Sequence, residues 1–173
     1  DISEDMLAVA MEKAVKNGVD IRYLCQDMTD FELYGTVDAI ICTLDAINYI
    51  TEPEKLKRMF SLVRNYLNPG GIFIFDINTE YKLKEVLGNN SFIFETEDIF
   101  YTWENEYDEN TKISTQNLTF FVKNGTKYER IDETHVQRSY SVYEISNMLK
   151  AAGLTLEGYF NLFDFSDNSN QSV

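Results

Sequence analysis

The sequence predicts an α/β protein whose helices and strands alternate around a mainly parallel sheet. Segments with helical and strand periodicity alternate up to about residue 90. The period then changes to two until about residue 138, and a helix and a strand follow. We therefore divide the chain into an α/β core, residues 1–90 and 139–173, and an inserted antiparallel β meander, residues 91–138. With 44% hydrophobic and 14% aromatic residues, the 173-residue chain has the composition of a folded domain.

The first helix is expected from Ser3 to about Asn17, because Ser3 is a favourable N-cap and Asn17-Gly18 is a stop signal. Four apolar residues share one face of this helix: Leu7, Met11, Ala14 and Val15. A short strand is predicted from Ile21 to Cys25, and a polar loop from Asp27 to Phe31. The apolar, β-branched segment Val37–Thr43 predicts a strand that is covered on both faces.

A second helix is predicted near Pro53, which suits a first helical position. Its apolar residues fall on one side: Leu56, Met59, Phe60, Val63 and Leu67. The Asn68-Pro69-Gly70-Gly71 segment should end this helix sharply, and Ile72–Phe75 should form another buried strand. A weaker helix is predicted from Thr79 to Leu87.

The inserted meander is predicted to contain about three antiparallel strands. Two turn signals divide it, at residues 108–111 and at residues 123–126, where Asn-Gly favours a hairpin. Period-two alternation places three residues on one face: Ile99, Tyr101 and Trp103. After the meander, a capping box at Ser141 and Glu144 begins a helix that ends near Gly153. Residues 155–163 are predicted to form a last strand, and the polar residues from 164 onward a mobile end.

The charge balance limits the classes of partner. The chain has 15 Lys and Arg against 29 Asp and Glu, a formal net charge of -14. A surface this acidic repels nucleic-acid phosphates and anionic membranes, and the apolar runs are too short to span a bilayer. Cys25 and Cys42 are predicted to be buried thiols of a reducing, cytoplasmic compartment. The sequence makes no prediction of the oligomeric state.

Candidate binding residues follow the predicted strands, where ligands bind in open α/β sheets. Asp1-Ile2-Ser3 precedes the first helix, Gln26-Asp27-Met28 follows one strand, and residues 43–49 follow the next. Asp76-Ile77-Asn78 follows the strand at Ile72–Phe75. A carboxylate at a strand end accepts hydrogen bonds from a ribose diol or an exocyclic amine, although each Asp also suits a cap or turn.

Five segments resemble class I S-adenosylmethionine-dependent methyltransferases, in the family's order. Residues 1–7 (DISEDML) are similar to the stretch after the second strand, and residues 26–28 (QDM) to the adenine-binding turn. Residues 37–42 (VDAIIC) resemble the fourth strand, and residues 67–73 (LNPGGIF) the turn into the fifth. Residues 140–154 resemble the helix before the sixth strand. The resemblance implies a Rossmann-like core that binds S-adenosylmethionine, with the meander in the place of a substrate lid.

The resemblance also implies roles for the cofactor-binding residues. Asp1 would hold the ribose hydroxyls, and Ile2 would pack on the adenine. Asp27 would accept a hydrogen bond from the adenine amino group, and the Met28 backbone N–H would face a ring nitrogen. The Leu44 region would lie under the methionine part of the cofactor.

The acceptor is predicted to be a small molecule. The resemblance places three residues near it: Asp45, Asn48 and Tyr49. His135, the single histidine, is either a structural residue or a general base that the meander aims into the cleft. Trp103, with Tyr101 and Tyr107 beside it, either packs in the sheet or forms an aromatic box for a cationic amine. No Cys/His cluster has the spacing of metal ligands, so no metal site is predicted.

The chain departs from the family pattern at both ends. It contains no G-x-G sequence, and the family's glycine-rich first loop, first two strands and last strand have no counterpart. A sheet without these members would leave backbone groups unpaired. We therefore expect these residues to belong to a longer protein of roughly 240–250 residues.

Two other functions remain open from the sequence. An acidic residue after the second strand also serves NAD(P)-dependent oxidoreductases with a Rossmann fold. Against that function, the chain has the Asn-Pro-Gly-Gly turn and lacks a plausible catalytic Tyr-x-x-x-Lys helix. The other alternative is a non-catalytic scaffold that binds a protein through the aromatic meander.

Overall fold

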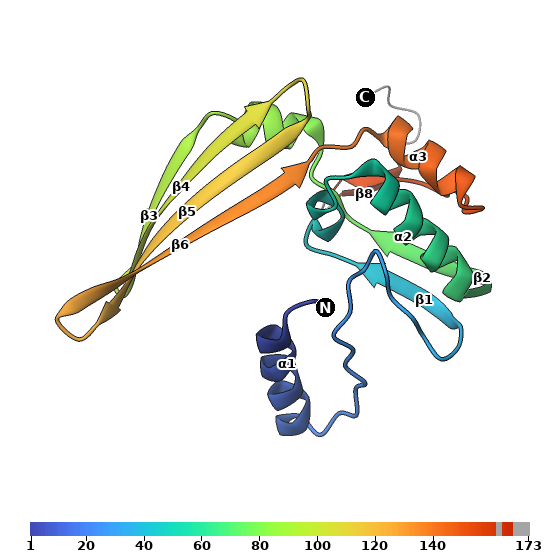
Figure 1. Ribbon diagram of the computed structural model, residues 1–173, viewed down its shortest axis with the longest axis horizontal. Coiled ribbons are helices and arrows are strands. Elements are labelled where there is room, and N and C mark those ends of the chain that lie inside the picture. The colour runs from blue at the N-terminus through green and yellow to red at the C-terminus, as the bar shows by residue number, and fades with distance from the viewer. Residues whose placement is uncertain (162–163, 168–173) are drawn as a thin grey trace.

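The computed structural model describes residues 1–161 and 164–167. It has an α/β part built on strands β1 (Val37–Cys42) and β2 (Leu67–Phe75), and a long antiparallel sheet that extends away from it (Figure 1). This arrangement confirms the predicted fold class.

The two parallel strands are joined by helix α2 (Pro53–Tyr66), which forms as predicted and ends before the Asn-Pro-Gly-Gly segment. The strands pair from Ala39 opposite Ile72 to Cys42 opposite Phe75. β2 begins at Leu67, earlier than expected, and Gly71 lies so close to β1 that a Cβ there would come within 2.9 Å of the Asp38 carbonyl oxygen. The glycine therefore permits the close approach of the two strands.

The main core lies on one face of this strand pair. It joins α2 to α3 (Val142–Ala151), whose predicted capping box is present. Phe60 packs against Phe73 and Phe75 with ring centroids 6.2 and 6.0 Å apart. The other buried side chains of this core include Ile47, Leu56, Met59, Val63, Tyr140, Ile145 and Leu149.

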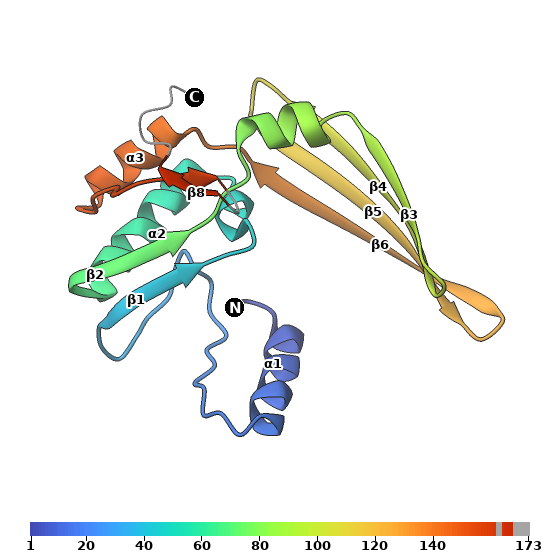
Figure 2. The same ribbon diagram turned by 180° about the vertical axis from the view of Figure 1, so that it is seen from behind.

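The second face of the strand pair is open, so the prediction that both faces are covered is wrong. Ile41, Ile72 and Ile74 are 66%, 60% and 54% exposed. Successive strand residues point to opposite faces, and α2 and α3 both pack on the same face. Helix α1 (Glu4–Lys16) lies to one side of the strand pair in both views (Figure 2).

Helix α1 has the predicted ends but not the predicted packing. The Ser3 hydroxyl accepts a hydrogen bond from the Met6 N–H, and Gly18 follows with a positive φ. Only Ala14 of the expected apolar face is buried, and Met11 and Val15 are exposed.

The predicted strand at residues 21–25 is absent. The stretch shares two backbone hydrogen bonds with Asp1, from Asp1 N to Leu24 O (3.3 Å) and from Gln26 N to Asp1 O (2.9 Å). This is the start of a parallel ladder, but no described strand continues it. Cys25 is exposed, contrary to the prediction, because the segment has no sheet to cover it.

The meander contains four strands rather than three. They are β3 (Ser91–Glu95), β4 (Ile99–Asp108), β5 (Ile113–Asn124) and β6 (Lys127–Arg138), paired in sequence order. The two predicted turns join β4 to β5 and β5 to β6. The additional turn lacks Gly and Asn, and Thr96 holds it by accepting from the Ile99 N–H at 3.1 Å.

A short π-helical segment, η2 (Lys82–Leu87), lies within the predicted weaker helix. Its Leu83 and Leu87 form a second core with Tyr107 of β4. Phe92 and Trp103 pack against this cluster. The second core therefore joins the end of the antiparallel sheet to the segment that follows β2.

The C-terminal segment differs from the prediction. Residues 155–159 have no strand structure, and the two-residue strand β7 (Phe160–Asn161) pairs with β8 (Asp164–Asp167). A strand forms only where a neighbour takes its backbone hydrogen bonds, and none of the described strands pairs with residues 155–159. Residues 162–163 and 168–173 of the predicted last strand and polar end lie outside the described residues. In the described part of the chain, no helix has the length and apolarity needed to cross a membrane.

Candidate active site

A cavity of about 360 Å³ opens between the antiparallel sheet and the short helix η1 (Ala46–Tyr49). The strand register explains which residues form the cavity wall. Trp103 lies opposite Leu118, and Gln116 lies opposite His135, so all four side chains are on one face of the sheet. The cavity has seven lining residues: Tyr49, Tyr101, Trp103, Gln116, Leu118, Phe120 and His135. The wall is mostly aromatic, as small-molecule sites commonly are.

A row of three hydrogen-bonded side chains lies at the cavity: the predicted residues Tyr49 and His135, and Glu133. The Tyr49 hydroxyl lies 3.0 Å from His135 Nδ1, and His135 Nε2 lies 3.2 Å from Glu133 Oε2. Burial and then the nearby Asp45 carboxylate raise the pKa of the Tyr49 hydroxyl, while the Gln137 amide acts in the opposite sense. The neutral tautomer that donates from Nε2 to the Glu133 carboxylate leaves Nδ1 as an acceptor for the Tyr49 hydroxyl.

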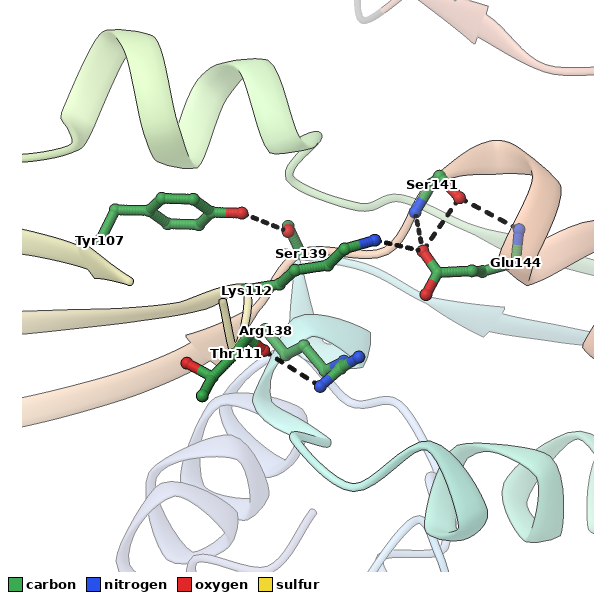
Figure 3. A network of polar contacts seen from close by, with 7 residues as sticks. All are labelled: Tyr107, Thr111, Lys112, Arg138, Ser139, Ser141 and Glu144. Atoms are coloured by element: carbon green, nitrogen blue, oxygen red, sulfur yellow. Dashed lines mark hydrogen bonds and ion pairs between the residues drawn. The ribbon is translucent and has the colours of Figure 1, made fainter. Parts of the chain in front are cut away.

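The predicted aromatic group is only partly assembled. Tyr101 and Trp103 both line the cavity, and the Tyr101 ring lies 5.2 Å from that of Phe120. Tyr107 does not reach the cavity; it is buried beside η2, and its hydroxyl lies 2.8 Å from the Ser139 hydroxyl (Figure 3).

The loop after β1 has a strained backbone. Leu44 and Asp45 adopt φ values of 62° and 48°, a left-handed conformation that costs a residue other than glycine about 1–3 kcal/mol. Leu44 is 83% exposed at this bend. The Asp45 N–H donates to Asp76 Oδ2 at 3.2 Å. Surrounding contacts must hold such a loop in place.

Polar side chains on four segments supply those contacts. Asp45 Oδ2 accepts hydrogen bonds from Asn78 Nδ2 at 3.0 Å and from Gln137 Nε2. Gln137 Oε1 in turn accepts from Asn78 Nδ2 and Gln116 Nε2, both at 3.2 Å. We call Asp45, Asn78, Gln116 and Gln137 the junction network. It joins the loop after β1 to the cavity wall.

Asn48 is a structural residue in this arrangement rather than part of the cavity lining. Its side chain is fully buried. The amide donates to the Asn78 and Arg138 carbonyl oxygens, both at 2.9 Å, and accepts from the Asn78 N–H at 2.8 Å. These three bonds hold η1 against both the segment after β2 and the end of β6.

A second polar group fixes the antiparallel sheet to α3 (Figure 3). Lys112 Nζ lies 3.2 Å from Glu144 Oε2, and the Arg138 guanidinium donates to the Thr111 carbonyl oxygen at 3.1 Å. The same Glu144 oxygen accepts from Ser141 in the capping box. The turn between β4 and β5 is therefore tied to the first turn of α3.

The predicted adenosine-binding residues lie together at the start of the chain and the 24–28 segment. Asp1 is hydrogen-bonded through its backbone to Leu24 and Gln26, which places it beside Asp27. Hydrogen bonds from the backbone N–H and then the hydroxyl of Thr29 to Oδ1 lower the pKa of Asp27. The carboxylate is therefore ionised at neutral pH.

These residues fit the adenosine part of S-adenosylmethionine. Asp1 Oδ1 accepts from the Ser3 N–H at 2.9 Å, and Asp27 Oδ2 accepts no hydrogen bond from the described residues. Ile2 is 70% exposed, and Met28 packs on the main core. Two carboxylates and an exposed apolar side chain are the groups that a diol, an amine and an aromatic base require.

The sequence did not indicate Gln116 or Gln137 as site residues. Both lie on the same sheet face as Trp103 and His135, at the two-residue spacing of a strand. A polar residue on the apolar face of a strand was the available signal. The strand register needed to pair them was not available from the sequence.

Comparisons with a protein-family model, with curated proteins and with solved structures agree. Residues 1–71 match the family model described as a methyltransferase domain. The chain is 35% identical, over 99% of its residues, to YqeM of Bacillus subtilis (strain 168), whose methyltransferase name specifies no substrate. It spans 70% of that protein's length.

Solved structures agree. An S-adenosylmethionine-dependent methyltransferase from Clostridium acetobutylicum ATCC 824 matches with a TM-score of 0.91 and 37% identity, over 96% of this chain and 67% of that one. The sugar N-methyltransferase KedS8 from Streptoalloteichus sp ATCC 53650 matches with a TM-score of 0.72 and 19% identity, over 91% of this chain and 62% of that one, a likeness of fold alone.

These similarities decide against the NAD(P)-dependent oxidoreductase and the non-catalytic scaffold. They also agree with the strand-end carboxylates and the parallel strand pair. The chain belongs to the class I S-adenosylmethionine-dependent methyltransferases.

Proposed function

We propose that the protein transfers the methyl group of S-adenosylmethionine to a small-molecule acceptor bound in the 360 Å³ cavity. The observation that carries this proposal is the position of Tyr49. It lines the cavity, and it follows Leu44 and Asp45 by only a few residues. One short segment thus joins the predicted cofactor site to the acceptor cavity.

The chain's own residues hold the cofactor in this proposal. Asp1 accepts from the ribose hydroxyls, Asp27 from the adenine amine, and Ile2 packs on the base, while Leu44 lies under the methionine part. When bound, S-adenosylmethionine supplies an electrophilic methyl group on a sulfonium sulfur. Because methyl transfer is an in-line displacement, correct positioning provides most of the acceleration.

Tyr49 and His135 form the proton pathway. The acceptor's proton passes to the Tyr49 hydroxyl oxygen as that hydroxyl gives its own proton to His135 Nδ1, 3.0 Å away. The resulting imidazolium is stabilised by Glu133, whose carboxylate lies 3.2 Å from Nε2. Such general-base assistance typically contributes 10²–10⁴-fold to the rate.

The acceptor that suits the cavity is a small amine. Tyr101 and Trp103 present aromatic rings, and Glu133 lies behind His135. Aromatic faces and a carboxylate both favour a cationic group. An amine must also lose a proton during methylation, which gives the Tyr49–His135 pair a function.

The remaining parts of the proposal concern location and partners. The meander, residues 91–138, serves as the substrate lid on the α/β core. We place the protein in the cytoplasm, because the exposed Cys25 and half-buried Cys42 thiols are both unpaired. The net charge of -14 supports a small-molecule acceptor rather than nucleic acid or an anionic membrane.

The first experiment tests cofactor binding by calorimetry with S-adenosylmethionine on the intact protein. Asp27→Ala should weaken binding by about 1–3 kcal/mol, because it removes an ionised acceptor. Asp20→Ala, a change of another exposed aspartate, is the matched control. Equal affinity of the two variants removes Asp27 from the cofactor site.

The second experiment measures methyl transfer from labelled S-adenosylmethionine to a panel of small amines and alcohols. His135→Gln and Tyr49→Phe should each lower kcat while cofactor affinity is kept. Thr134→Val, next to His135 but on the opposite sheet face, is the control. Unchanged kcat in both variants rules out the proton pathway, and transfer to alcohols alone rules out the amine acceptor.

A further inference from the structure

Gln137 occupies a central position in the junction network. It lies near the end of β6 and is only 2% exposed. Among the described residues, its side chain is the one that hydrogen-bonds both to Asp45, in the loop after β1, and to Gln116, in the cavity wall. It therefore touches both halves of the proposed site without lining the cavity itself.

The orientation of its amide follows from the groups around it. Gln137 Nε2 donates to the Asp45 carboxylate, and Oε1 accepts from the amide nitrogens of Asn78 and Gln116, both at 3.2 Å. Rotating the amide by half a turn would place its oxygen against the carboxylate and its nitrogen against two donors. The neighbours thus fix one orientation, and a glutamate could not reproduce it while ionised.

The partner on the cofactor side is held in a conformation that requires support. Asp45 and the preceding Leu44 both have positive φ values. A residue other than glycine keeps such a left-handed conformation only where several surrounding contacts hold it there. The Asp45 side chain is anchored by Gln137 and Asn78, and its backbone N–H by Asp76.

The partner on the acceptor side lies beside the proposed proton pathway. Gln116 is opposite His135 in the β5–β6 register, and both line the cavity. Burial and then Asp45 raise the pKa of Tyr49, a third cavity-lining residue, and the Gln137 side chain opposes that rise through hydrogen bonding, so Gln137 lies close to this residue as well.

We propose that Gln137 is a positioning residue that holds the loop after β1 in its cofactor-binding conformation and couples that loop to the acceptor cavity through Asp45 and Gln116. This proposal rests on the proposed function. Coupling of this kind is reciprocal: a ligand that orders the loop also orders the cavity wall, and the reverse. Gln137 thereby affects both binding steps without contacting either ligand.

The test uses S-adenosylhomocysteine as the probe, so that it needs no knowledge of the acceptor. Gln137→Glu is assayed at alkaline pH so that the introduced carboxyl group is ionised. A carboxylate then replaces the donor that faces Asp45, and the dissociation constant should rise roughly tenfold or more relative to the wild type at the same pH. The control is Asn117→Asp, which makes the same amide-to-acid change on the outer face of β5, where the side chain is exposed. Its dissociation constant should stay unchanged.

A double variant distinguishes positioning from general damage. In Asp45→Asn combined with Gln137→Glu, the new amide donates to the new carboxylate, so the bond is restored with its polarity reversed. Affinity should recover to within about threefold of Asp45→Asn alone. Absence of recovery, or an unchanged constant in Gln137→Glu, overturns the proposal. If the wild-type protein does not bind the probe, it is the cofactor assignment that fails instead.

The chain's single tryptophan reports on the coupling. Trp103 lines the cavity, so its fluorescence should change when the probe binds the wild-type protein. Gln137→Met, which keeps the length but removes the polar atoms, should still fold and bind the probe more weakly. At saturation, its Trp103 response should be lost. A full Trp103 response in Gln137→Met overturns the coupling.

Discussion

The two ends of the antiparallel sheet differ although the same strands form both. β5 and β6 pair without interruption from Ile113 opposite Arg138 to Asn124 opposite Lys127. At the end near the α/β part, Ser114 and Gln137 are almost fully buried. At the far end Tyr128 is 60% exposed. Strand pairing alone therefore does not decide which part of the sheet is core.

Attachment to other elements accounts for the difference. Near the α/β part, η2 covers Tyr107, η1 bonds to Arg138 through Asn48, and α3 bonds to Lys112 through Glu144. At the far end, Figure 1 shows no helix of the described chain beside the sheet. The near end is thus part of the folded body, whereas the tip of the sheet around Asn124 and Lys127 is an exposed two-sided ribbon.

The largest expected effect comes from removing apolar contacts at the near end. Leu83 of η2 is fully buried between the sheet and the α/β part. Leu83→Ala should lower the free energy of unfolding by about 2–5 kcal/mol, through lost transfer energy and the cavity left behind. Chemical denaturation followed by Trp103 fluorescence measures it.

The comparison for Leu83 is Ile131→Ala at the far end, where the side chain is 42% exposed. This change should cost less than about 1 kcal/mol, because most of the removed surface already contacts water. Equal costs for the two variants would mean that the ends of the sheet do not differ in packing.

The next largest loss of stability is expected from removing the Asn48 hydrogen bonds, which hold η1 against the segment after β2 and the end of β6. Asn48→Ala would leave three backbone groups without their partner: the buried N–H and carbonyl of Asn78 and the part-buried carbonyl of Arg138. A buried unpaired group costs about 1–3 kcal/mol, so we expect a loss in that range in urea denaturation. Asn117→Ala, an exposed amide on the same sheet, should be nearly neutral. A neutral Asn48→Ala would show that water replaces these bonds.

The sequence predicted the parts of the fold that local chemistry determines. Ser3 and Ser141 begin helices as N-caps, and residues 108–111 and 123–126 form turns, because these signals act over a few residues. The turn at Thr96 was missed, since a threonine hydroxyl rather than Gly or Asn holds it. The predicted strand at 21–25 is absent, and residues 155–159 of the strand predicted at 155–163 have no strand structure, because a strand also needs a partner that its own sequence does not specify.

In the candidate site, too, the sequence indicated residues with local signals and missed contacts between distant residues. Strand-end position was the basis for predicting Asp27 and Tyr49, and of these Tyr49 lines the cavity; period two placed Trp103 on the sheet face that lines it. Asn48 does not line the cavity, and its hydrogen bonds run to residues 30 and 90 positions away, which the sequence does not reveal. Gln137 was missed for the same reason, because its partner Asp45 is 92 positions away.

A smaller effect is expected at the helix cap that receives the sheet. Ser141→Ala removes the cap of α3 and should lower the free energy of unfolding by about 0.5–2 kcal/mol.

Burial alone would raise the pKa of Glu144, but hydrogen bonds from Ser141 and then Lys112 lower it below its ordinary value. Stability from this carboxylate is therefore present above its unfolded pKa and is lost as the pH falls through the folded pKa.

Glu144→Gln tests that pH dependence by denaturation at neutral and at acid pH. The variant should be less stable than the wild type at neutral pH, and the difference should shrink as the wild-type carboxylate becomes protonated in acid. A constant difference across this range would show that the Glu144 charge does not contribute to the attachment.

The smallest effect is expected where the sheet is free on both faces. Arg130 and Asp132 form a pair on β6 with 2.9 Å contacts, and Thr119 donates to the same carboxylate at 2.8 Å. Hydrogen bonds from Arg130 and then Thr119 lower the pKa of Asp132, yet both partners remain exposed. Water and salt compete with exposed charges, so Asp132→Asn should leave urea denaturation unchanged at physiological ionic strength. A loss as large as that of Asn48→Ala would show instead that the far end contributes to stability, and that a visible ion pair there counts as much as a buried amide.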